Sequence, residues 1–81
     1  MGMLRVLSRR GDDRVAWDEQ LAEQGDPDAL KAIREAERIF REQRERGATA
    51  FRVEQSRVLV RLDAFDPASE QIVMLPRVVG G

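Results

Sequence analysis

The most informative segment for the fold of this chain is Gln71-Ile72-Val73-Met74-Leu75-Pro76. Four consecutive apolar residues are typical of a strand that is covered on both faces, and such strands lie in the interior of a sheet. Pro76 bounds the segment because proline has no N–H group to donate to a sheet. We therefore predict a central strand over residues 71–75, which needs partner strands from earlier in the chain.

A long amphipathic helix is predicted to begin at Asp26-Pro27. Aspartate is suited to cap a helix, and proline to the first helical position. Apolar residues then recur at spacings of three and four and form one stripe, which consists of Ala29, Ile33, Ala36 and Phe40, widened by Leu30, Ala32 and Ile39. Gly47 stands where a left-handed residue ends a helix. We expect this helix to pack on a sheet through its apolar stripe.

Two hairpins flank the predicted helix. The first pairs residues 3–8 with 14–18 around a turn that contains Gly11, and it places Trp17 at the edge of the core. The second pairs residues 50–53 with 58–62, where Phe51, Val53, Val58, Val60 and Leu62 alternate with other residues. The order hairpin, helix, hairpin, strand predicts an α+β fold, ββαββ(β), with one helix across a mixed sheet. The domain covers residues 1–76, and residues 77–81 form a flexible tail.

Composition limits the functions of the 81-residue chain. Its net charge is -1 with both signs interspersed, so no nucleic-acid partner is expected. It contains no cysteine and no histidine, which removes thiol and imidazole catalysis and thiolate metal sites. No apolar run is long enough to span a membrane. We expect a cytoplasmic protein that is not an enzyme, binds no metal or cofactor and does not associate with a membrane.

The chain ends in Gly80-Gly81, directly beyond the predicted central strand. At ordinary glycine usage, two terminal glycines occur by chance in roughly one chain in two hundred. A tail in this position would leave the domain from a fixed point and present its carboxylate to solvent. The diglycine is therefore the main candidate site.

The predicted element order resembles the β-grasp fold of the ubiquitin-like superfamily. Residues 70–81, EQIVMLPRVVGG, resemble the closing strand and tail of bacterial ubiquitin-like proteins and of the small subunit of molybdopterin synthase, a sulfur carrier. The resemblance implies that an adenylating enzyme uses ATP to activate Gly81, since a carboxylate is a poor acyl donor. It also implies that Arg77, Val78 and Val79 contact that enzyme, and it adds as partners a conjugating enzyme, a deconjugating metallopeptidase and target proteins.

Two further sites are hypotheses. Consecutive strand residues point to opposite faces, so two of the four apolar residues Ile72, Val73, Met74 and Leu75 would lie away from the helix. They would form an apolar docking patch with either Leu4 and Val6 or Met3 and Leu7, unless loops cover them. Lys31 is the only lysine and hence the only side-chain amine for self-conjugation.

Three functions remain open at this point. In the first, the chain is a protein modifier and Gly81 is joined to a target amine. In the second, Gly81 becomes a thiocarboxylate that donates sulfur in molybdopterin, thiamine or tRNA thiolation. In the third, the chain is a non-catalytic interaction module and its terminal glycines are incidental.

Overall fold

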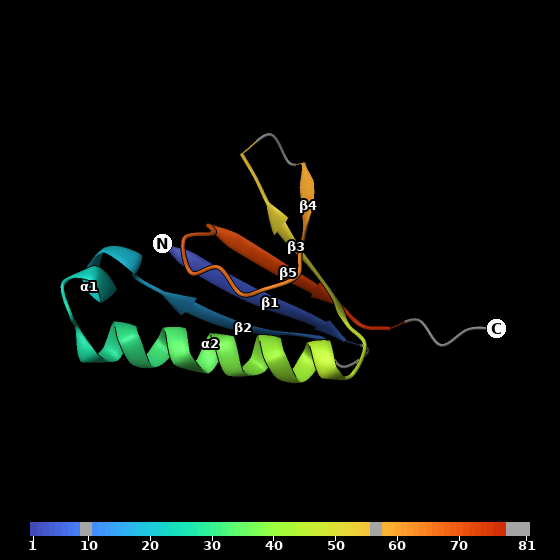
Figure 1. Ribbon diagram of the computed structural model, residues 1–81, viewed down its shortest axis with the longest axis horizontal. Helices are drawn as coiled ribbons and strands as arrows, with labels where there is room; N and C mark the ends of the chain where they lie inside the picture. The colour runs from blue at the N-terminus through green and yellow to red at the C-terminus, as the bar shows by residue number, and fades with distance from the viewer. Residues whose placement is uncertain (9–10, 56–57, 78–81) are drawn as a thin grey trace.

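A five-stranded mixed sheet with one main helix makes up the protein (Figure 1). The structure, a computed structural model, describes residues 1–8, 11–55 and 58–77. The elements are β1 (Gly2–Ser8), β2 (Gly11–Trp17), α1 (Glu19–Glu23), α2 (Pro27–Glu45), β3 (Thr49–Val53), β4 (Leu59–Leu62) and β5 (Gln71–Leu75). The strand order is β2-β1-β5-β3-β4, with β1 and β5 parallel and the other pairs antiparallel. The α+β class and the central position of residues 71–75 are confirmed.

Helix α2 begins and ends at the predicted signals. The Asp26 carboxylate accepts a hydrogen bond from the Ala29 N–H at 2.9 Å, and Pro27 occupies the first turn. At the other end Gly47 has φ +92°, and the Ala48 N–H reaches back to the Gln43 carbonyl. This is the arrangement by which a left-handed glycine satisfies the last carbonyls of a helix. In the described part of the chain, no helix is long and apolar enough to cross a lipid bilayer.

The first hairpin is confirmed, but its second strand begins at Gly11 rather than at residue 14. Pairing runs from Gly2 opposite Trp17 to Ser8 opposite Gly11. The polar residues that suggested a turn instead extend the strand, because the Asp12 carboxylate accepts hydrogen bonds from Arg5 on the neighbouring strand. Opposite charges across a strand pair stabilise it, so a polar segment can still form a strand.

A short helix that was not predicted lies between β2 and α2. Helix α1 forms because the Asp18 side chain accepts a hydrogen bond from the Leu21 N–H at 3.1 Å. Gly25, with φ +84°, turns the chain from α1 toward α2. The aspartate three residues before Leu21 was a capping signal that the sequence interpretation did not use.

The second hairpin is confirmed. In β3, however, the large apolar residues lie on the face of the sheet away from α2. Ala50 is fully buried on the helix side, next to Leu62 of β4 and Met74 of β5. Phe51 and Val53 are only half-buried and lie on the other face. Register against β4 and β5 decides the facing of β3, and the alternation along one strand does not contain that information.

The core lies between the sheet and α2. It consists of Leu4, Val6, Trp17, Ala36, Phe40, Ala48, Ala50, Leu62, Ile72 and Met74. Trp17, expected at the core edge, is 2% exposed, and its Nε1 donates to the Pro67 carbonyl at 3.0 Å. Phe65, in the loop before β5, packs its ring 5.5 Å from that of Trp17 and 5.9 Å from that of Phe40. This loop therefore closes one side of the core.

Candidate functional site

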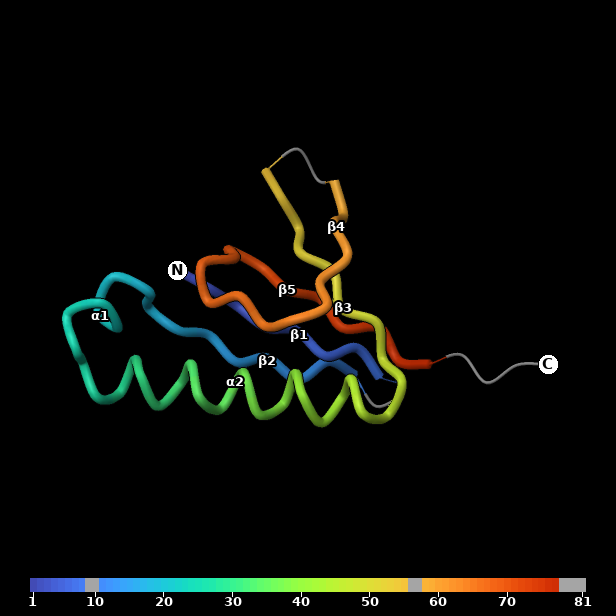
Figure 2. Tube along the Cα trace, viewed as in Figure 1, coloured from blue at the N-terminus to red at the C-terminus, as the bar shows by residue number. Residues whose placement is uncertain are grey.

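The candidate activation site is the C-terminal tail, which continues from β5. Gly80 and Gly81 lie outside the described residues, as do Val78 and Val79. The last described residues, Pro76 and Arg77, are exposed and follow a strand that is paired on both sides, with β1 and β3. In Figure 2 the chain leaves the sheet at the end where α2 also finishes. The described chain therefore ends two residues beyond the central strand of the sheet.

The predicted apolar patch on β5 is divided between the two faces of the sheet. Ile72 and Met74 are fully buried in the core beneath α2, so the prediction of a docking role is wrong for these two residues. Val73 is half-buried and Leu75 is 38% exposed, and both lie on the opposite face. Strict alternation along a strand gives this division.

The face of the sheet that points away from α2 is called the open face. Register places on it Met3, Arg5, Leu7, Asp12, Arg14, Ala16, Thr49, Phe51, Val53, Leu59, Arg61, Gln71, Val73 and Leu75. The contribution of β1 is therefore Met3 and Leu7, because Leu4 and Val6 are buried in the core. Most of the apolar side chains on the open face remain half-exposed, in contrast to the core residues of the central strands on the helix side.

Sequence reasoning missed the part of the open face that β3 provides. Phe51 lies directly beside Val73, which in turn lies beside Arg5. The signal that would have found this contact is the register of β3 against β5, since β5 was already predicted as the central strand. Three strands thus supply one continuous surface with a partly apolar centre.

Arginines lie on both sides of the apolar centre of the open face. The Asp12 carboxylate accepts hydrogen bonds from Arg5 at 2.8 Å and from Arg14 at 3.1 Å, so one acid serves two guanidinium groups. On the β4 side, the Arg61 Nε lies 3.8 Å from the highly exposed carboxylate of Asp63. The surface therefore carries excess positive charge next to apolar side chains, which suits a partner surface with an acidic rim.

The pKa of Asp12 provides a test of this arrangement. Hydrogen bonds from Arg5, and next from Arg14, hold the pKa of this carboxyl below its ordinary value of 3.8. Because the folded-state pKa is depressed, the charged form stabilises the fold above the unfolded pKa, and this contribution is lost as the pH falls through the folded pKa. An NMR titration of the Asp12 carboxyl carbon should give a midpoint below that of an aspartate in an unstructured peptide. An equal or higher midpoint would contradict the pairing.

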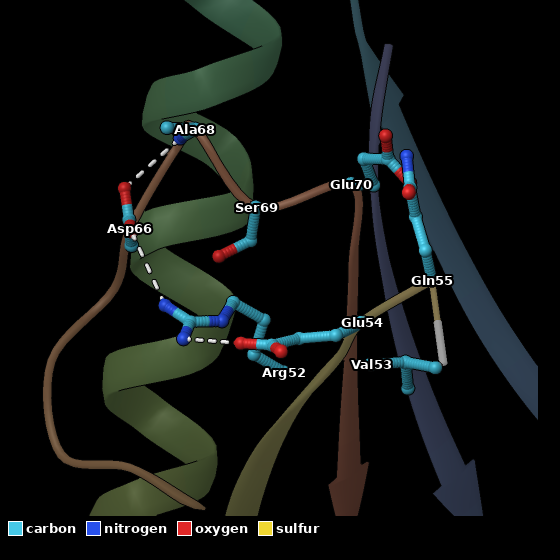
Figure 3. A pocket seen from close by; sticks show the side chains of 8 residues that line it. All are labelled: Arg52, Val53, Glu54, Gln55, Asp66, Ala68, Ser69 and Glu70. Atoms are coloured by element: carbon cyan, nitrogen blue, oxygen red, sulfur yellow. Dashed lines mark hydrogen bonds and ion pairs between the residues drawn. The ribbon is translucent and has the colours of Figure 1, made fainter. Parts of the chain in front are cut away.

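A pocket of about 340 Å³ lies between the end of β3 and the loop before β5 (Figure 3). Arg52 donates to Glu54 at 2.7 Å and lies 4.0 Å from Asp66, so the pocket's own acids neutralise this guanidinium. Ser69, which also lines the pocket, is 3% exposed, and its hydroxyl has no hydrogen-bond partner among the described residues. The pocket contains none of the predicted site residues.

Replacing Ser69 by alanine should stabilise the fold. A buried hydroxyl without a partner costs on the order of 1 kcal/mol or more, and alanine removes that group without leaving a large cavity. Urea denaturation of Ser69→Ala should therefore show a higher free energy of unfolding. The matched variant Ser8→Ala should show no gain, since the Ser8 hydroxyl donates to the Gly11 carbonyl at 3.0 Å. A clear loss in Ser69→Ala would mean that the hydroxyl is satisfied.

The remaining predicted site is Lys31, which is exposed near the start of α2. Among residues 1–8, 11–55 and 58–77, no three acidic side chains gather as a metal site would require.

Comparison with known proteins gave no match to a family model, to a curated protein or to a solved structure. The function is therefore inferred from the tail and from the open face.

Proposed function

We propose that this chain is a ubiquitin-like protein modifier of the β-grasp fold, whose Gly81 carboxylate is adenylated by a separate enzyme and joined to a target amine. The observation that carries the proposal is the diglycine terminus that follows the central strand β5 by a few residues. The element order ββ, helix, ββ, β, with the first and last strands side by side at the sheet centre, supports the β-grasp assignment.

The chemistry assigns separate roles to the carrier and to its partner. The Gly81 carboxylate attacks the α-phosphorus of ATP, and pyrophosphate leaves, which gives a mixed anhydride with AMP. An enzyme thiol then displaces AMP to form a thioester, and a target amine displaces the thiol to form an amide. The carrier has no cysteine or histidine of its own, so the partner supplies the nucleotide site and the thiol.

The tail and the open face have complementary roles in this proposal. Glycine has no Cβ, so Gly80 and Gly81 suit a narrow passage into an adenylation site. The open face provides the docking surface, with Phe51 and Val73 at its apolar centre and Arg5 beside Val73. Docking through a sheet surface beside the tail would hold the carboxylate at the reacting phosphorus. Lys31, on α2, lies on another element and remains available as an acceptor.

A charge on the open face should weaken docking without unfolding the domain. Val73→Lys places an ammonium group at the apolar centre, and loss of a central contact at an interface costs about 1–3 kcal/mol, or roughly fivefold to a hundredfold in affinity. Because Val73 is half-buried and away from the core, the melting temperature should change little. The control is Val58→Lys, at a 52% exposed valine beside the β3–β4 turn. Equal losses of enzyme affinity in both variants would contradict this docking surface.

Hydroxylamine trapping tests the proposed activation directly. An acyl-adenylate or thioester at Gly81 reacts with hydroxylamine to give a C-terminal hydroxamate, with release of AMP or of the enzyme thiol. The full chain would be incubated with extract of its native host, ATP and hydroxylamine, and its intact mass measured. We expect an ATP-dependent hydroxamate, and none when ATP is omitted. Absence of the hydroxamate in both reactions would contradict activation of Gly81.

A further inference from the structure

Arg77, the last described residue, packs against the end of α2. A Cβ built on Gly47 would lie 3.0 Å from the Cδ of Arg77, 3.4 Å from its Cβ and 3.6 Å from its Cγ. The aliphatic part of Arg77 therefore occupies the space that a side chain at position 47 would fill. Gly47 is also the residue that ends α2, with φ +92°. One glycine thus serves both the helix end and the start of the tail.

Two features make this contact suited to hold the chain. Pro76 has a restricted φ angle, so the step from β5 to Arg77 has little freedom. The positive charge of Arg77 stands near the C-terminal end of a helix, where exposed carbonyls favour a cation. An arginine can pack its methylene groups on a surface while its guanidinium stays in water, and Arg77 is exposed overall.

We propose that the contact between Arg77 and Gly47 positions the tail, by fixing the point and direction in which the chain leaves the domain. The inference rests on the proposed function, because a fixed exit is useful when the C-terminus must enter an enzyme. A tail that is ordered at its base loses less conformational entropy when it binds. Arg77 is accordingly a positioning residue, in addition to any contact that its guanidinium makes with the enzyme.

Two glycine variants separate the contact from backbone strain. Gly47 and Gly25 both have positive φ, +92° and +84°, so alanine at either position is strained. A Cβ on Gly25 would meet no described atom within 4 Å, so only Gly47→Ala displaces Arg77. Backbone ¹⁵N relaxation of the Arg77 amide would be compared with that of Leu75. We expect Arg77 to be ordered in the wild type and in Gly25→Ala, and markedly more mobile in Gly47→Ala. Equal mobility in all three proteins overturns the proposal.

A second pair of variants leaves the helix end untouched, and it decides the matter if Gly47→Ala does not fold. Arg77→Ala removes the methylene groups that cover Gly47, whereas Arg77→Met keeps an unbranched side chain without the charge. The amide at position 77 should become mobile in Arg77→Ala and stay close to wild type in Arg77→Met. A wild-type amide that is already as mobile as in Arg77→Ala overturns the proposal.

The activation reaction gives a separate readout. With the adenylating enzyme, Gly47→Ala and Arg77→Ala should raise the KM for the carrier by about threefold to tenfold with little change in kcat, because order at the base of the tail is lost before binding. Gly25→Ala should behave like wild type. KM values that are equal in Gly47→Ala and Gly25→Ala overturn the positioning role. If no enzyme adenylates the wild type, the proposed function fails, and the relaxation measurements still decide whether Arg77 is held.

Discussion

Deletion of Gly80-Gly81 is expected to abolish ATP-dependent activation of the chain while leaving its melting temperature almost unchanged. Every core residue in the described part of the chain precedes Pro76, so the deletion leaves this core complete. Activation is lost because the new terminus ends in Val79, whose branched side chain does not suit a passage built for glycine. Pyrophosphate exchange measures the activation, and circular dichroism measures the melting temperature.

A variant of unchanged length separates the requirement for glycine from the requirement for a tail of this length. Replacement of Gly80-Gly81 by two alanines keeps the number of residues, and we expect it to be activated far less than wild type. Unimpaired activation of either variant, or a large fall in melting temperature, would contradict the role assigned to the diglycine.

Gly2→Ala should have the largest effect on stability of the substitutions considered. A Cβ at position 2 would lie 2.2 Å from Cε2 and 2.3 Å from Nε1 of Trp17, which is well inside atomic contact. The indole is buried and held by its hydrogen bond to Pro67, so it has little room to move aside. We expect a loss of about 3 kcal/mol in the free energy of unfolding, at the upper end of the usual range for overpacking. Urea denaturation measures it.

A double-mutant cycle shows whether this contact is the cause. Trp17→Phe replaces the indole with a smaller ring, so Gly2→Ala should cost less in that background than in the wild type. The two losses would simply add if the added methyl group did not meet the indole, and that result would contradict the explanation.

Local signals predicted the parts of the fold that are determined locally. The boundaries of α2 follow from Asp26, Pro27 and Gly47, each of which acts through its own backbone or capping geometry. The central strand was predicted from its apolar run, although only Ile72 and Met74 are covered and Val73 and Leu75 lie on the open face. The candidate activation site was also available from the sequence, since Gly80-Gly81 is read directly from it.

Local sequence patterns did not predict the contacts between distant segments. Three contacts join residues that lie far apart in the sequence. They are the packing of Phe65 between the rings of Trp17 and Phe40, of Gly2 against Trp17, and of Arg77 on Gly47. The open face needed the register of three strands, because a shift of one residue exchanges the two faces. These features depend on the assembled sheet.

Peptide mapping of proteins from the native host, together with the intact mass of the free carrier, shows whether Gly81 is joined to target amines. Trypsin cleaves after Arg77, so a modified lysine would carry the remnant Val78-Val79-Gly80-Gly81. We expect this remnant on lysines of other proteins, and a free carrier that ends in an ordinary carboxylate. A carrier that accumulates as the thiocarboxylate, with no remnant on any protein, would contradict the modifier function and point to sulfur transfer.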